Sequence, residues 1–65
     1  MTYIVTEIQN GAVVATSFED KATAFEMFFD VARYIPNSEL EVHTAMITND
    51  KGFTLFQPIT KDIMK

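Results

Sequence analysis

The sequence predicts one α+β domain in the order β-β-α-β-β, with two antiparallel hairpins in a four-stranded sheet and one helix packed on one face. Three observations predict this fold. An Asn-Gly pair at positions 10–11 joins two runs rich in β-branched residues, a stretch with helical spacing occupies 21–35, and a turn around Gly52 joins two further strand-like runs. A chain of 65 residues accommodates a single hydrophobic core, so we assign residues 1–65 to one domain.

The first hairpin is the most closely specified element. Its strands are expected at 2–9 and 12–18, and Asn-Gly suits the type I′ turn between them, in which both central residues have positive φ. A two-residue turn also determines the register, which places Ile8 opposite Val13. Apolar side chains occur on both faces of this hairpin, whereas a half-exposed antiparallel sheet normally alternates apolar and polar residues. We therefore expect both faces to be covered, at least in part.

The helix is expected over 21–35, with Asp20 or Ser17 as its N-cap and Pro36 just beyond its end. Its apolar residues form two adjacent stripes that cover about two thirds of the circumference, more than the arc of a little over 100° typical of a surface helix. We expect one stripe to pack on the sheet: Phe25, Phe28, Phe29, Ala32 and Ile35. The second stripe is expected to form an interface with another subunit: Ala24, Met27, Val31 and Tyr34.

The second half of the chain predicts strands at 40–48 and 53–59, joined by a turn at 49–52. Pro58 cannot donate to a ladder, so the last strand is expected to lie at an edge or to stop there, and 60–65 stay unassigned. One helix covers one face of such a sheet, and the other face would need a second subunit. That face is expected to include Tyr3, Val5, Phe18, Ile47 and Phe56. In an alternative arrangement, the two hairpins separate and interleave across a dimer.

Composition and charge exclude several classes of function. The net charge is −4 and the 5 basic residues are scattered, which disfavours direct nucleic-acid binding and attachment to a membrane through a basic face. The chain has no cysteine and one histidine, so we expect neither a metal site nor a cofactor. It has no apolar run of about 20 residues and no signal-peptide pattern at its start, so we expect a cytoplasmic protein without a membrane partner.

Few residues are candidates for chemistry. Histidine is the side chain most often used for chemistry near neutral pH, and His43 is the chain's single histidine. It is interpreted either as a ligand contact or general base, or as a strand histidine paired with a neighbour such as Glu41. Neither Ser17 nor Ser38 lies in a glycine-rich nucleophile turn, so the sequence predicts no enzyme. If a small ligand binds, the expected contacts are His43, Tyr34 and Phe29.

The segments IVTEIQNG, SFEDKATAFEMFF, NSELEVHTAMI and NDKGF together resemble a pattern in very short, uncharacterised proteins of phages, prophages and mobile elements of Gram-positive bacteria. The pattern covers nearly the whole chain. It differs at Phe28-Phe29, where the family pattern would hold an aromatic residue followed by histidine. The resemblance implies a setting in a bacterial host cell, where such proteins are often accessory factors that bind host machinery.

The leading expectation is therefore a non-enzymatic binding protein, a phage or mobile-element accessory factor that acts as a homo-oligomer on a host protein. One alternative is a sponge that sequesters a small nucleotide-like ligand at a subunit interface. A second alternative is an acidic mimic of nucleic acid, built from the carboxylates around the helix.

Overall fold

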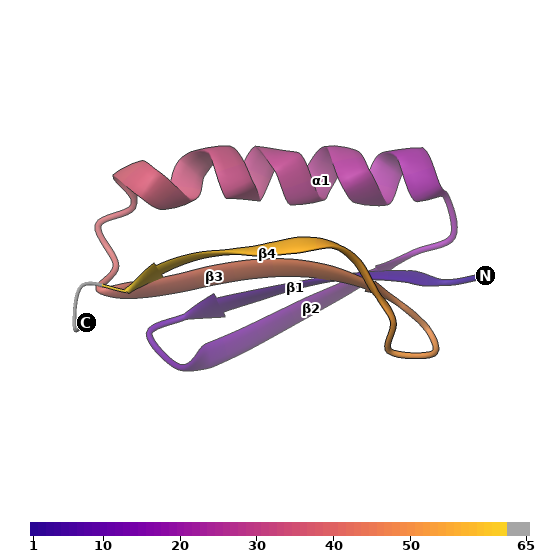
Figure 1. The fold of residues 1–65 in the computed structure, drawn as a ribbon, viewed down its shortest axis with the longest axis horizontal. Coiled ribbons are helices and arrows are strands. Elements are labelled where there is room, and N and C mark those ends of the chain that lie inside the picture. The colour runs from indigo at the N-terminus through magenta and orange to yellow at the C-terminus, as the bar shows by residue number, and fades with distance from the viewer. Residues whose placement is uncertain (63–65) are drawn as a thin grey trace.

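A computed structural model describes residues 1–62 and shows an α+β fold in which one helix lies across a single four-stranded sheet (Figure 1). In chain order the elements are β1 (Tyr3–Gln9), β2 (Ala12–Phe18), α1 (Lys21–Tyr34), a short 3₁₀ turn η1 (Ile35–Asn37), β3 (Val42–Asn49) and β4 (Thr54–Asp62). The order β-β-α-β-β and the single helix-covered sheet are confirmed.

The sheet has the order β2-β1-β3-β4, and each neighbouring pair is antiparallel. β1 and β3 therefore occupy the centre, and β2 and β4 form the two edges. Because β1 pairs with β3 inside one chain, the two hairpins are not separated as the alternative arrangement required.

The first hairpin has the predicted register at all seven pairs, from Gln9 opposite Ala12 to Tyr3 opposite Phe18. Asn10 and Gly11 have φ values of 51° and 94°, the positive values that a type I′ turn requires. Asn10 also joins this turn to the start of β3, since its side-chain oxygen accepts from the Val42 N–H at 2.9 Å and its own N–H donates to the Val42 carbonyl at 2.8 Å.

Helix α1 begins at the predicted cap. The Asp20 carboxylate accepts from the Thr23 backbone N–H at 3.1 Å and from the Thr23 hydroxyl at 2.6 Å. These two hydrogen bonds, that from the hydroxyl foremost, lower the pKa of Asp20 below its ordinary value of 3.8. At the other end, the helix tightens into η1, which contains Pro36, as expected for a residue that cannot continue the backbone hydrogen bonds.

The core lies between α1 and the central strands and consists of Val5, Ala24, Phe28, Ile35, Ala45 and Ile47. Phe28 and Ile35 of the predicted core stripe are buried, and Phe25 packs against them, but two of the predicted positions were wrong. Ala24 was expected in the subunit interface but is fully buried within the chain, whereas Phe29 was expected in the core and is 41% exposed. The buried line follows positions 24, 28 and 35, and the absence of a large side chain at Ala24 lets the first half of the helix approach the sheet.

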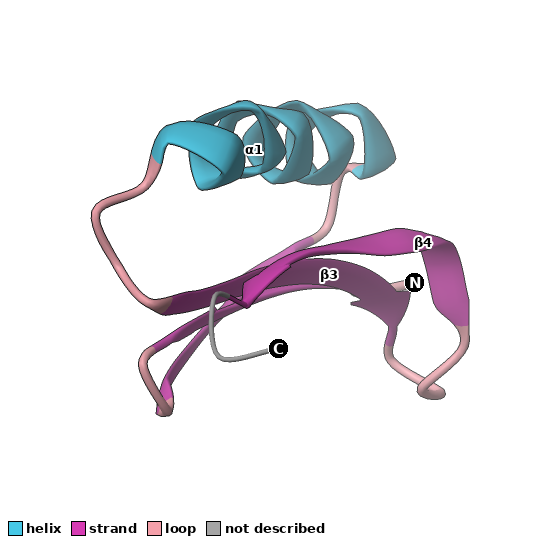
Figure 2. Cartoon of the chain, turned by 60° about the vertical axis from the view of Figure 1, so that its left-hand side comes forward, coloured by secondary structure: helices cyan, strands magenta, loops and turns pink. Residues whose placement is uncertain are grey.

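The expectation for the sheet faces was also wrong. Val5 and Ile47 are buried beneath the helix, and the Phe56 ring lies 5.7 Å from the Phe28 ring, so these residues belong to the helix-covered face. Tyr3 and Phe18 pack against the same core. Figure 2 shows α1 on one side of the sheet, and within residues 1–62 no other element covers the opposite side. We call that uncovered side the open face.

The last strand extends beyond its predicted end. β4 continues past Pro58 to Asp62, and two register shifts against β3, between Ala45 and Thr48, accommodate the irregular strand. Thr60–Asp62 of the unassigned tail thus belong to β4, and 63–65 lie outside the described residues. Within 1–62, α1 and η1 are too short or too polar to cross a membrane.

Candidate functional site

His43 lies at one end of the sheet, on the helix-covered face of β3. Burial alternates along β3, so His43, Ala45, Ile47 and Asn49 point inward and their neighbours point outward. The His43 side chain is only 7% exposed, and a polar ring at that depth needs hydrogen-bond partners.

Both ring nitrogens of His43 have such partners. Nε2 lies 2.6 Å from the Glu7 carboxylate, and Nδ1 lies 2.9 Å from the Ser38 hydroxyl. The Ser38 hydroxyl oxygen also accepts from the Leu40 backbone N–H at 3.1 Å. One consistent set of protons has the Leu40 N–H donating to Ser38, the Ser38 hydroxyl donating to Nδ1, and Nε2–H donating to Glu7.

A third strand joins this network. Lys61 of β4 is opposite His43 in the register, and its amino group donates to the Ser38 backbone carbonyl. The segment between η1 and β3 is thus attached to β1, β3 and β4 through one serine. We name Glu7, Ser38, His43 and Lys61 the serine latch.

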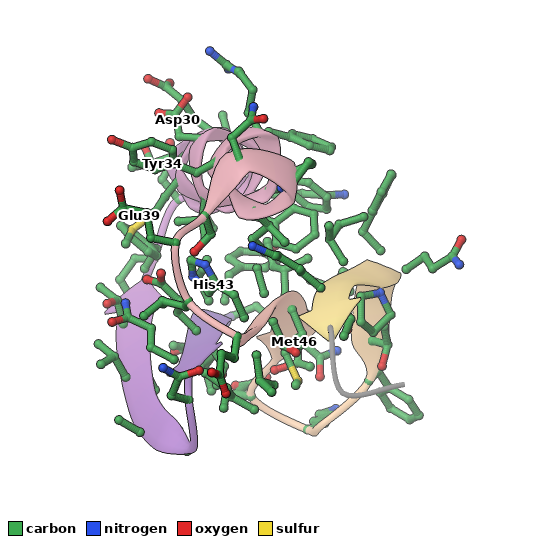
Figure 3. The ribbon with its side chains drawn as sticks, turned by 90° about the vertical axis from the view of Figure 1, so that its left-hand side faces the viewer. Asp30, Tyr34, Glu39, His43 and Met46 are labelled. Atoms are coloured by element: carbon green, nitrogen blue, oxygen red, sulfur yellow. The ribbon has the colours of Figure 1, made fainter. Side chains whose placement is uncertain are left out.

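An open pocket of about 510 Å³ adjoins the serine latch. Its lining consists of Glu7, Gln9, Tyr34, Asn37, Ser38, Glu39, Leu40 and His43. Figure 3 shows Tyr34, Glu39 and His43 together at this end of the molecule, on the side of β2. The carboxylates of Glu7 and Glu39 make the lining acidic, which opposes a phosphate-bearing ligand and therefore does not favour the nucleotide sponge.

The order Ser38–His43–Glu7 has the residue types of a hydrolase triad. Two features favour a structural role instead. The Ser38 hydroxyl already accepts from the Leu40 N–H within its own loop, and the His43 ring is nearly closed off from solvent. The sequence suggested Glu41 as a partner, but His43 binds Glu7, which is 36 positions away.

The three predicted ligand contacts do not come together. His43 and Tyr34 line the same pocket, and Tyr34 is 75% exposed at its edge. Phe29 lies on the other flank of α1, where its ring is 5.1 Å from the Phe56 ring of β4. Phe29 is therefore not part of the pocket. Within 1–62, no three His, Cys, Asp or Glu residues are grouped so that they could hold a metal ion.

The four residues predicted to form a subunit interface lie in different environments. Ala24 is buried in the core and is excluded as a surface contact. Met27 and Val31 are half-buried against that core. Tyr34 lies beside them at spacings of seven and three residues, so the three share the flank of α1 that faces β2.

Besides the pocket, an exposed surface is formed by the edge strand β2 and the open face. This edge strand, AVVATSF, contains no charged residue and no proline, and Val13 and Val14 are 65% and 52% exposed. On the open face, β2 is continuous with the outward side chains of the other strands. By register these are Ile4, Thr6, Ile8, Val13, Ala15, Ser17, Val42, Thr44, Met46, Thr48, Thr54, Thr60 and Asp62. Asp62, at the end of β4, is the one charged residue among them.

Comparisons of the chain with protein-family models, with curated proteins and with solved structures returned no match. The resemblance to small phage and mobile-element proteins therefore stays a prediction. The inference of function therefore rests on the open face of the sheet and on the edge strand β2.

Proposed function

We propose that this protein is a non-enzymatic binding protein, a phage or mobile-element accessory factor that acts as a homo-oligomer in the bacterial cytoplasm and docks a host protein on the open face of its sheet. The observation that carries this proposal is the scarcity of charge on the open face in a chain whose net charge is −4, since Asp62 at the end of β4 is the one charged residue that the register places there. Most of the other charges lie on the helix, in the loops and around the pocket.

The size of the open face supports the same proposal. Four strands spaced about 4.8 Å apart, each about seven residues long, cover roughly 440 Å². The largest apolar patch on a small protein is typically roughly 300–600 Å² and is often functional, and Ile4, Ile8 and Met46 supply apolar surface at the centre of this face. The threonines add hydroxyl groups that keep this face hydrated when it is free and that can hydrogen-bond across an interface. The partner that fits such a face is a flat protein surface with few charges.

A matched pair of variants tests the docking surface. Met46 lies on the open face, on the side of the sheet away from α1 (Figure 3), and Met46→Lys places a charge near its middle. Glu26→Gln, on the exposed surface of α1, changes the net charge by the same amount and serves as the control. We expect the host protein that binds the wild type to bind the Glu26→Gln variant equally and the Met46→Lys variant at least tenfold more weakly, because an interface charge without a partner is costly.

The measurement is the affinity of each variant for the host protein identified by capture on the wild type, with circular dichroism to verify the fold. Equal affinities for the Met46→Lys and Glu26→Gln variants would remove the open face as the docking site.

A further inference from the structure

We infer that two copies of the protein join along β2 into one eight-stranded antiparallel sheet, with Ala15 of one copy opposite Ala15 of the other on a two-fold axis. This inference rests on the proposed function for its biological use, since it supplies the second copy that a homo-oligomer needs. The structural case is independent of any host protein.

The two edges of the sheet differ in their protection. Natural edge strands are usually blunted by proline, bulges or inward charges, because their free N–H and C=O groups otherwise pair with another chain. β4 has all three devices: Pro58, two register shifts against β3, and the inward-pointing Lys61. β2 has none of them over Ala12–Phe18, and its register with β1 is regular throughout. The edge without protection is therefore β2.

The hairpin geometry determines which groups of β2 point outward. In a two-residue hairpin the residues that flank the turn exchange hydrogen bonds, and such pairs alternate along the ladder. Ala12, Val14, Thr16 and Phe18 therefore bond to β1. The N–H and C=O groups of the intervening residues point away from the sheet: Val13, Ala15 and Ser17.

These outward groups specify one register for a second copy. In an antiparallel pair related by a two-fold axis, all three outward residues find partners when Ala15 faces its own equivalent. Val13 then faces Ser17 of the second copy, and the pairing forms about six main-chain hydrogen bonds. A shift by one pair in either direction leaves an outward residue of each copy without a partner.

The side chains are compatible with this register. Directly opposed side chains share a face, so Val14 meets Thr16 of the second copy on the helix side and the two Ala15 methyl groups meet on the open face. Small and β-branched side chains fit such positions, and no like charges are brought together. The exposed Val13 and Val14 both gain cover.

Joining the copies also gives the open face the size that a protein partner requires. The face grows from roughly 440 Å² to roughly 880 Å², close to the about 800 Å² that each side contributes to a standard interface. On the other side, both helices stand on the same face of the joined sheet, because the two-fold axis is perpendicular to the sheet. Since α1 packs mainly on β1 and β3, the helices are separated by the paired β2 strands. Their flanks with Met27 and Tyr34 then face each other across a trough whose floor is the paired β2 strands.

Disulfide trapping tests the register, because the native chain has no cysteine. In the inferred dimer the two Ala15 Cα atoms are about 5.5 Å apart, within the range that a disulfide spans. We expect Ala15→Cys to form a covalent dimer under mild oxidation. Val13→Cys is the matched control, since its side chain is equally accessible but its equivalent lies about 13 Å away along the strand. Cross-linking of both variants to the same extent would overturn the register.

Sedimentation equilibrium on the purified protein tests the dimer itself. We expect wild type to have a mass of 14.8 kDa, twice the 7.4 kDa of one chain, and Ala15→Lys to have 7.4 kDa because two lysines meet on the axis. Thr60→Lys adds the same charge to the open face on β4, at the opposite edge of the sheet from β2, and this variant is expected to stay dimeric.

Two results would overturn the inference: a wild type that is monomeric at about 100 μM, or an Ala15→Lys variant that is dimeric. These outcomes are separable from the proposed function. A monomeric wild type that still binds its host protein through Met46 removes the dimer alone. A dimer whose host binding is unaffected by Met46→Lys removes the docking surface alone.

Discussion

The contact between Glu7 and His43 predicts how much the serine latch contributes to stability. Glu7→Ala removes the acceptor of the His43 Nε2–H, which is a buried group with a partner at 2.6 Å. A buried donor left without a partner costs about 1–3 kcal/mol. The Glu7 side chain is 20% exposed, so water can reach the vacated position in part, and we expect a loss of about 2 kcal/mol.

Glu7→Gln separates the hydrogen bond from the charge. A glutamine side-chain oxygen can still accept from Nε2–H, but hydrogen bonds between neutral groups contribute about 1 kcal/mol less than those to charged groups. We therefore expect Glu7→Gln to lose about 1 kcal/mol, half the loss for Glu7→Ala. A domain of this length has a total stability of roughly 3–10 kcal/mol, so both losses are measurable.

Urea denaturation followed by far-ultraviolet circular dichroism measures both variants. With a slope of about 1 kcal/mol per molar urea, the midpoint should fall by about 2 M for Glu7→Ala and about 1 M for Glu7→Gln. The experiment is best done in the Ala15→Lys background, where subunit association does not add to the apparent stability.

Amide hydrogen exchange at Leu40 supplies a second measurement, since its N–H donates to Ser38 in the same network. We expect faster exchange there in Glu7→Ala. Unchanged midpoints in both variants would refute the role of the latch. Equal losses in both would show that the carboxylate charge, and not the filled hydrogen bond, stabilises the fold.

Two further predictions follow from the core and from the helix cap. Phe28→Ala should destabilise the protein by about 3–5 kcal/mol because the ring is fully buried, whereas Phe29→Ala should cost much less because Phe29 is partly exposed. Urea denaturation measures both losses of stability, and equal losses would contradict the packing described. The pKa of Asp20 is lowered in the folded state by its bonds to Thr23, so the ionised carboxylate stabilises the fold above about pH 3.8 and that contribution is lost as the pH falls through the folded-state pKa. The stability advantage of wild type over Asp20→Asn should therefore be present at pH 6 and vanish below the folded-state pKa, and an advantage independent of pH would contradict it.

The hairpin was predictable in full because its determinants are local. An Asn-Gly turn allows few backbone conformations, and the turn in turn determines every cross-strand pair up to Tyr3 and Phe18. The cap at Asp20 was predictable for the same reason, since its acceptor and its donors lie within three residues. Such features depend little on the rest of the chain.

The sequence alone did not predict which stripe of α1 and which side of the sheet are buried, because that choice depends on tertiary packing. The helix has two apolar stripes and the first hairpin has two partly apolar faces. The hydrophobic periodicity is the same whichever stripe packs on whichever face. The observed combination is decided by how closely the helix can approach β1 and β3, and the small Ala24 permits this approach. Considering side-chain size as well as hydropathy would have predicted that Ala24 faces the sheet, since a small residue allows close approach.

The latch was missed because its members are distant in sequence, but one signal was present. The predicted register placed Glu7 on the same face as Val5, so covering that face would also cover a carboxylate. Such a carboxylate needs a partner from another strand, and His43 is the chain's single histidine. Joining those two observations would have predicted the contact.

The contrast between the two edges links the stability of this chain to its function. A domain of about 60 residues removes only about 60% of its unfolded surface from water, and without cysteine this chain has no disulfide to compensate. Exposed Val13 and Val14 on an unprotected β2 would be a liability in a monomer, because such edges recruit other chains. In the inferred dimer, a second copy at β2 would bury the same residues and occupy the free N–H and C=O groups. Pro58 and the register shifts protect β4 and would keep it from extending the sheet into a fibre. The inferred dimer would thereby account for the protection of one edge and its absence at the other, and it would present a face with few charges that is wide enough for the proposed protein partner.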